Sequence, residues 1–75
     1  IKIDRSFIDH CDTNSENEAF LRKARHLTRE MGIQILAEGI ERQEELDLCR
    51  ELDFDLGQGY LLGRPAPYAR FAKAQ

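Results

Sequence analysis

Three polar side chains stand where strands of a parallel sheet would present groups for chemistry. Lys2 lies in the alternating run Ile1–Asp4, Glu38 follows the apolar run Ile33–Ala37, and Gln58 lies between two glycines. A carboxylate at the C-terminal end of a parallel strand occupies the place where barrel active sites are built. A glutamine amide both donates and accepts hydrogen bonds, which suits a base edge, a phosphate or an ordered water. We expect this ammonium, carboxylate and amide to converge from three β-segments on one sheet edge.

Each of these residues also has a purely structural interpretation. Lys2 and Asp4 leave the same face of a strand, so on an edge strand they would be solvated. Inside a barrel, ionic groups need an ion, an anion or a partner. Glu38 could cap the next helix, although Glu41 suits that role better because it lies beside the helix start. Gln58 could be a buried amide at a strand bend, since glycines mark bulges or close approaches.

Four basic residues crowd the predicted first helix without indicating an anion site. Glu18 precedes Arg22 by four residues and Glu30 adjoins Arg29, a spacing typical of exposed ion pairs on a helix. We interpret the group as a solvated helix surface; it consists of Arg22, Lys23, Arg25 and Arg29.

The histidines and cysteines give no metal or nucleophile pattern. Cys11 and Cys49 are too few and too far apart for a disulfide framework, and they lack zinc spacing. We expect both to be reduced thiols in a cytoplasmic protein; whether the parent is tethered to the inner membrane is open. His10 and His26 are near neither each other nor a cysteine pair, so a Cys–His or zinc site would require unforeseen proximity.

Hydrophobic periodicity predicts alternating strands and helices. The predicted strands cover 1–8, 33–37 and 56–62, and the helices cover 15–31, 42–52 and 68–74, with a proline-rich loop at 63–67. Ser15 and Glu18 read as a capping box, and Gly32 ends the first helix. The expected inward faces are Phe20, Ala24, Leu27 and Met31 on the first helix and Leu46, Cys49 and Leu52 on the second.

This order predicts an α/β fold, a parallel sheet with right-handed crossover helices. The chain has 75 residues and a formal net charge of −3, which argues against binding DNA or RNA polymers, and no apolar run is long enough to span a membrane. Three parallel strands alone would leave open edges, which predicts self-association, with a homodimer as the simplest form. The same elements fit three of the eight units of a (β/α)₈ barrel of about 250 residues.

Three motifs in order resemble the C-terminal part of the EAL domain, a family of cyclic di-GMP phosphodiesterases. They are KIDRSF at Lys2–Phe7, AEGIE at Ala37–Glu41 and QGYLLGRPAP at Gln58–Pro67. The resemblance implies a modified (β/α)₈ (TIM-like) barrel of which residues 1–75, one fragment of a single domain, supply the last three strands with their helices. The partners it implies are cyclic di-GMP and the missing N-terminal part of the barrel.

By resemblance, the full domain hydrolyses cyclic di-GMP to linear pGpG with Mg²⁺ or Mn²⁺ in a two-metal site. Lys2 would contact the attacking water and the phosphate, and Glu38 would be the catalytic glutamate that holds or deprotonates a metal-associated water. Asp4 would orient these groups, Glu41 would fix the active-site loop, and Gln58 would support the pocket floor.

The same resemblance places the Glu-Ala-Leu signature and most metal ligands upstream of Ile1. We therefore expect no complete metal site here, with Glu38 reaching a metal only through water, and no activity from the isolated chain. Two alternatives stay open. One is a degenerate, non-catalytic EAL domain that senses cyclic di-GMP or binds a protein. The other is a free-standing α/β interaction module with Lys2, Asp4 and Glu38 freely exposed.

Overall fold

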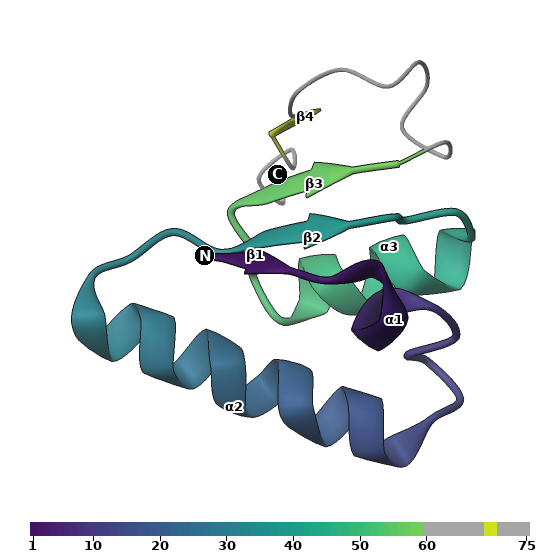
Figure 1. Ribbon diagram of the computed structural model, residues 1–75, viewed down its shortest axis with the longest axis horizontal. Helices are drawn as coiled ribbons and strands as arrows, with labels where there is room; N and C mark the ends of the chain where they lie inside the picture. The colour runs from purple at the N-terminus through teal and green to yellow at the C-terminus, as the bar shows by residue number, and fades with distance from the viewer. Residues whose placement is uncertain (60–68, 71–75) are drawn as a thin grey trace.

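The computed structural model describes residues 1–59 and 69–70, which form a mainly parallel sheet with helices (Figure 1). The strand order is β1-β2-β3-β4; β1, β2 and β3 are mutually parallel, and β4 pairs antiparallel with β3. The described elements are β1 (Lys2–Ile3), α1 (Arg5–Ile8), α2 (Ser15–Met31), β2 (Leu36–Glu38), α3 (Gln43–Glu51), β3 (Leu56–Gln58) and β4 (Ala69–Arg70).

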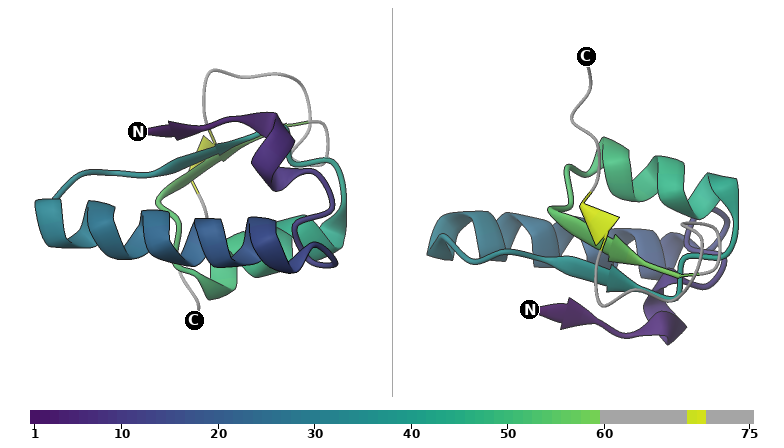
Figure 2. Two further views of the ribbon diagram at one scale, coloured as in Figure 1. Left: turned by 60° about the horizontal axis from the view of Figure 1, so that its bottom comes forward. Right: turned by 90° about the horizontal axis from the view of Figure 1, so that it is seen from above.

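The helices α2 and α3 cover the same face of the sheet, as the two further views show (Figure 2). Ile3 and Ala37 are paired in register, and both belong to the core beneath these helices. Lys2 and Leu36 are the preceding register pair and therefore leave the opposite face. The core cluster consists of Ile3, Ile8, Cys11, Leu21, Ile35, Ala37, Ile40, Leu46, Leu48, Cys49, Leu52 and Phe54.

The α/β prediction is confirmed: parallel strands alternate with crossover helices. The second predicted helix, 42–52, appears as α3 with Arg42 and Leu52 as its caps. Its expected inward residues Leu46, Cys49 and Leu52 are all buried. Gly32 ends α2 in the left-handed conformation, with φ of 68°, as its residue type predicts.

The predicted first strand, 1–8, is wrong beyond Ile3. The structure has a short helix, α1, over Arg5–Ile8, with Asp4 as its N-cap. The Asp4 carboxylate accepts a hydrogen bond from the Ser6 backbone N–H, which starts a helix where alternation predicted a continued strand. Local capping therefore overrides the weak period-2 pattern at this point.

Two predictions for the first helix are also wrong. Asn14, not Ser15, is the N-cap of α2, and its side chain accepts from the Asn17 backbone N–H. The expected inward face is largely exposed: Phe20 is 40%, Leu27 58% and Met31 66% accessible. The helix is instead rotated so that Leu21 and Thr28 are fully buried, with Ala24 packed beside them.

A satisfied hydroxyl explains how a threonine can take the inward position on α2. Thr28 Oγ1 donates to the carbonyl of Arg25 at 3.0 Å, so its burial leaves no unpaired group. On the exposed side, the Phe20 ring stacks on Phe7 with centroids 4.3 Å apart. Apolar periodicity alone does not distinguish these two faces.

The second and third strands differ in extent from the prediction. β2 begins at Leu36 and includes Glu38, whereas a strand over 33–37 was expected. The Ile35 N–H donates to the Asp55 side chain instead of to a neighbouring strand. Ala69–Arg70 form β4 where a helix over 68–74 was expected, so that prediction is wrong at those two residues. The remainder of that helix, the loop 63–67 and the strand beyond Gln58 fall outside the described secondary structure.

Candidate functional site

Lys2 and Glu38 meet on the open face of the sheet. Lys2 is in register with Leu36 on the neighbouring strand, so Glu38, two residues further along, leaves the same face. Lys2 Nζ lies 3.9 Å from Glu38 Oε2, and the side chains are 62% and 33% exposed. The two side chains form an ion pair whose N···O distance exceeds that of a hydrogen bond. The ammonium and the carboxylate can therefore both still bind a third group that bridges them.

Gln58 continues this arrangement on the third strand. It is in register with Glu38 and therefore projects from the same face of the sheet. The structure thus brings together the ammonium, the carboxylate and the amide that the sequence singled out. Lys2 is the first residue of β1, whereas Glu38 and Gln58 are the last residues of β2 and β3 and so lie at the C-terminal ends of parallel strands.

Asp4 performs a structural task at the end of β1. Its Oδ2 accepts from the Ser6 backbone N–H at 3.0 Å and from the Ser6 hydroxyl at 2.7 Å. These two hydrogen bonds lower the pKa of Asp4 below its usual value, and the bond from the Ser6 backbone N–H has the larger effect. The carboxylate therefore fixes the turn from the Lys2 strand into α1.

The expected helix-capping role of Glu41 belongs to Glu45 instead. Glu45 Oε1 accepts from the backbone N–H groups of Glu41 at 3.1 Å and Arg42 at 3.2 Å, which closes the N-terminus of α3. The Glu41 side chain points elsewhere: its Oε2 accepts from Arg5 Nη2 at 2.6 Å. Glu41 thus joins the segment after Glu38 to the start of α1.

Glu45 is a fully buried carboxylate that sequence reasoning missed. Besides its cap bonds, its Oε2 accepts from the His10 backbone N–H at 2.7 Å, so it joins the segment after β1 to the segment after β2. Its position three residues after Arg42 is the capping-box spacing, the one local signal that could have revealed it.

Asp9, His10 and Glu45 bring potential ligand atoms within 4.8 Å of one another. The Glu45 oxygens are already occupied by backbone donors, so a metal is not needed to explain the cluster.

The segment after Glu38 also touches the end of β3. The Ile40 N–H donates to the Gln58 carbonyl at 3.0 Å. Gly59 has φ of 155°, and a Cβ there would overlap the backbone nitrogen and oxygen of Ile40. The predicted close approach of another group at these glycines is confirmed at Gly59.

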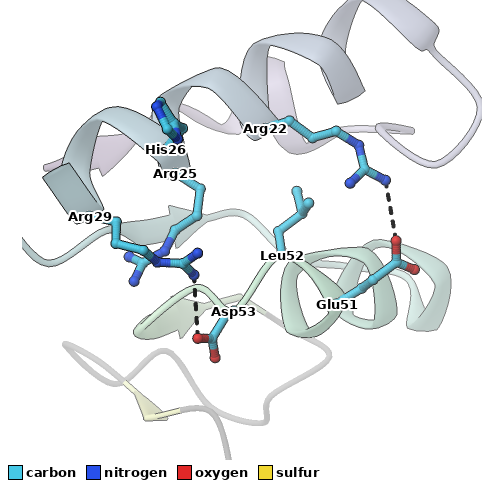
Figure 3. Close-up of a pocket in the computed structure, with 7 residues that line it drawn as sticks. All are labelled: Arg22, Arg25, His26, Arg29, Glu51, Leu52 and Asp53. Atoms are coloured by element: carbon cyan, nitrogen blue, oxygen red, sulfur yellow. Dashed lines mark hydrogen bonds and ion pairs between the residues drawn. The ribbon is translucent and has the colours of Figure 1, made fainter.

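The basic residues of α2 line a hollow of about 270 Å³ beside α3 (Figure 3). Arg22 pairs with Glu51 at 3.2 Å, and Arg29 pairs with Asp53 at 3.5 Å. Arg25 is not solvated as expected: its side chain is 13% exposed and pairs with Asp55 at 2.9 Å. Acidic partners thus offset the arginines, and this surface fits the structural interpretation better than an anion site.

Both cysteines are free and fully buried, as predicted for reduced thiols. Burial raises the pKa of Cys11 to about 11 and that of Cys49 to about 12, so both remain neutral thiols at physiological pH. Neither is a nucleophile.

No helix in the described part of the chain has the length and apolar character needed to cross a bilayer.

The family model of the EAL domain matches residues 1–65 of this chain. The chain belongs to the EAL domain family. The cyclic di-GMP phosphodiesterase PdeB of Shewanella oneidensis is 33% identical over 73 residues, which are 97% of this chain and 8% of PdeB. The cyclic di-GMP phosphodiesterase RocR of Pseudomonas aeruginosa is 34% identical over 95% of this chain and 18% of RocR.

Solved EAL structures share the same local fold. The EAL enzyme Bd1971, in a form with cAMP and cyclic-di-GMP bound, gives a TM-score of 0.80 at 38% identity, over 87% of this chain and 17% of Bd1971. The PaMucR phosphodiesterase in complex with c-di-GMP gives 0.79 at 36% identity, over 85% of this chain and 26% of that one. The chain therefore spans a minor part of each of these EAL proteins, and the predicted fold class, part of an EAL barrel, is confirmed.

Proposed function

We propose that the EAL domain containing this chain hydrolyses one phosphodiester bond of cyclic di-GMP and releases linear pGpG. One observation carries the proposal: Lys2 of β1 and Glu38, the last residue of β2, lie 3.9 Å apart on one face of two adjacent parallel strands. Relatives named as cyclic di-GMP phosphodiesterases support the choice of substrate.

In this proposal, Lys2 and Glu38 have different roles in the attack on the phosphate. The Lys2 ammonium binds a non-bridging phosphate oxygen and stabilises the negative charge that grows as water attacks phosphorus. Glu38 accepts a proton from that water as the water oxygen bonds to phosphorus. The P–O bond to the ribose oxygen then breaks, and that oxygen takes a proton from solvent to become a hydroxyl. Gln58, beside Glu38 in register, hydrogen-bonds the substrate or an ordered water. Asp4 and Glu41 act on position, through the α1 cap and the Arg5 pair.

The donor set fits Mg²⁺ or Mn²⁺ only in part. Glu38 offers a half-exposed carboxylate on the Lys2 face, whereas the Asp4 carboxylate is committed to Ser6. Hard divalent cations take about six oxygen ligands, so this chain would supply one contact, Glu38 through water, and the rest of the domain the others. Bound metal would neutralise phosphate charge and lower the pKa of the attacking water. We therefore expect the isolated chain to be inactive.

The direct test is hydrolysis by the complete domain with Mg²⁺ or Mn²⁺, followed by separation of pGpG from cyclic di-GMP. We expect Lys2→Met and Glu38→Gln each to lower kcat by about 10²- to 10³-fold. Lys23→Met, at an exposed position on α2, is the control and should leave kcat unchanged. Loss of less than threefold in both active-face variants contradicts the assignment.

A sensor that binds cyclic di-GMP without hydrolysing it is the second candidate. An EAL domain can keep the Lys2–Glu38 pair and lack metal ligands elsewhere, so binding with no turnover under any divalent cation would favour it.

The compartment and assembly of the domain belong to the same proposal. Two buried free thiols fit a reducing, cytoplasmic location. Homodimer formation stays a prediction, which sedimentation of the domain over a concentration series tests.

A further inference from the structure

One arginine crosses between the segments that carry Lys2 and Glu38. Arg5 is the first residue of α1, three positions after Lys2. Its Nη2 donates to Glu41 Oε2 at 2.6 Å, three positions after Glu38. Between these ends the aliphatic stem of Arg5 lies over Gly39, where an added Cβ would be 2.5 Å from Arg5 Cγ. We call this contact the Arg5 strap: the Arg5 side chain, Gly39 and Glu41.

Other contacts fix the same segment from different sides. Toward β3, the Ile40 N–H is held by the Gln58 carbonyl. Toward α3, the Glu41 N–H is held by Glu45. Toward α1, which follows β1, the segment is held by the Arg5 strap. Gly39 has φ of 78°, so this peptide turns in a conformation that glycine favours and the stem can lie directly on it.

We propose that Arg5 is a positioning residue for hydrolysis, because the strap sets the separation of Lys2 and Glu38. This inference rests on the proposed function. The strap's ion pair is substantially exposed, with side chains 64% and 37% accessible, so it contributes little to folding stability. Its consequence is geometric: without it, the Glu38–Gly39 peptide loses one of the contacts that hold it against the β1–α1 segment.

Three substitutions in the complete domain separate the parts of the strap. Arg5→Lys keeps both stem and cation, Arg5→Met keeps the stem alone, and Arg5→Ala removes both. We expect kcat to decrease in the order Lys, Met, Ala, with Arg5→Met about tenfold below wild type. That loss lies within the roughly hundredfold that a 1 Å misplacement can cost. KM should stay within about twofold, because the substrate is bound by other groups.

The matched control is Arg22→Met. Arg22 is also a substantially exposed arginine in ion pairs, with Glu18 and Glu51, but it lies on α2 away from Glu38. It should leave kcat unchanged. A purely structural role for Arg5 would lower the Tm and leave the kcat of the folded enzyme intact, and that result overturns the proposal. A rise in KM at constant kcat also overturns it, because Arg5 would then bind substrate.

Amide hydrogen exchange tests the strap without requiring turnover. Arg5→Met should speed exchange at residues 39–42 at least several-fold, whereas Arg22→Met should not. If the wild-type domain fails to hydrolyse cyclic di-GMP, the proposed function is wrong. The amide exchange rates at residues 39–42 then decide whether Arg5 restrains this segment. Unchanged exchange in Arg5→Met shows that Arg5 does not restrain the segment and refutes the inference.

Discussion

Replacing Glu45 with alanine should destabilise the domain more than any single exposed ion pair would. The carboxylate is fully buried and accepts from three backbone N–H groups, those of His10, Glu41 and Arg42, at 2.7, 3.1 and 3.2 Å. Hydrogen bonds to a charged group contribute about 1.5–3 kcal/mol each, but burial of the carboxylate itself is costly. Offsetting these terms gives a net loss of about 3 kcal/mol on Glu45→Ala.

Thermal unfolding of the complete domain, followed by circular dichroism, measures this loss. For a domain of barrel size, 1 kcal/mol shifts the Tm by about 2–4 °C, so Glu45→Ala should lower it by about 6–12 °C. Glu44→Ala is the matched control, because Glu44 is the adjacent residue, 61% exposed, with an ion pair of 3.5 Å to Arg42. We expect less than about 2 °C from the control. Equal shifts in the two variants would refute the buried-hub role of Glu45.

The remaining predictions concern the thiols and the close backbone contact. Cys11 and Cys49 should resist alkylation at pH 8 in the native protein and react fully in denaturant, because both are buried; rapid native labelling would contradict this. Since folding raises their pKa values from 9.0 to about 11 and about 12, their contribution to stability is complete below pH 9 and is lost as the pH rises through 11 to 12. A pH titration of the Tm should show this alkaline decline, and Cys11→Ser/Cys49→Ser should flatten it. Gly59→Ala should lower the Tm by several degrees, because the new methyl group meets the Ile40 backbone; an unchanged Tm would show that β3 can shift away.

The sequence predicts best the elements whose signals are local and mutually consistent. Helix α3 was expected within one residue of its observed ends, because Leu46, Cys49 and Leu52 have a clear helical spacing and caps lie at both ends. Gly32 ends α2 as expected, since few other residues adopt that left-handed conformation.

Errors arose where two local signals compete. At Asp4, the alternation of apolar residues favoured a strand, but a side-chain cap to Ser6 begins a helix. On α2, Leu27 was expected to face inward but is exposed, and Thr28, for which the apolar pattern gave no prediction, is buried. A threonine can be buried once its hydroxyl finds a backbone carbonyl, and apolar periodicity does not detect that bond.

In the candidate site, too, some residues were predictable from the sequence and others were not. Strand parity together with the expected parallel barrel predicted that Lys2 and Glu38 converge, and the two side chains do approach each other. The roles of Arg5 and Glu45 were not predictable, because their partners lie about 35 residues away in sequence and depend on how β1 and β2 pair. The sequence analysis assigned neither of them a role, although Arg5 spans the two segments that bear the site and Glu45 is buried between them.

The most direct measurement of the central claim is the kcat of the double variant Lys2→Met/Glu38→Gln in the complete domain, set beside the two single variants. If both side chains act on one phosphate from one face of the sheet, their effects overlap. The double variant should then lose no more than about tenfold beyond the poorer single variant. Losses that multiply fully, as for two independent sites, would contradict the account.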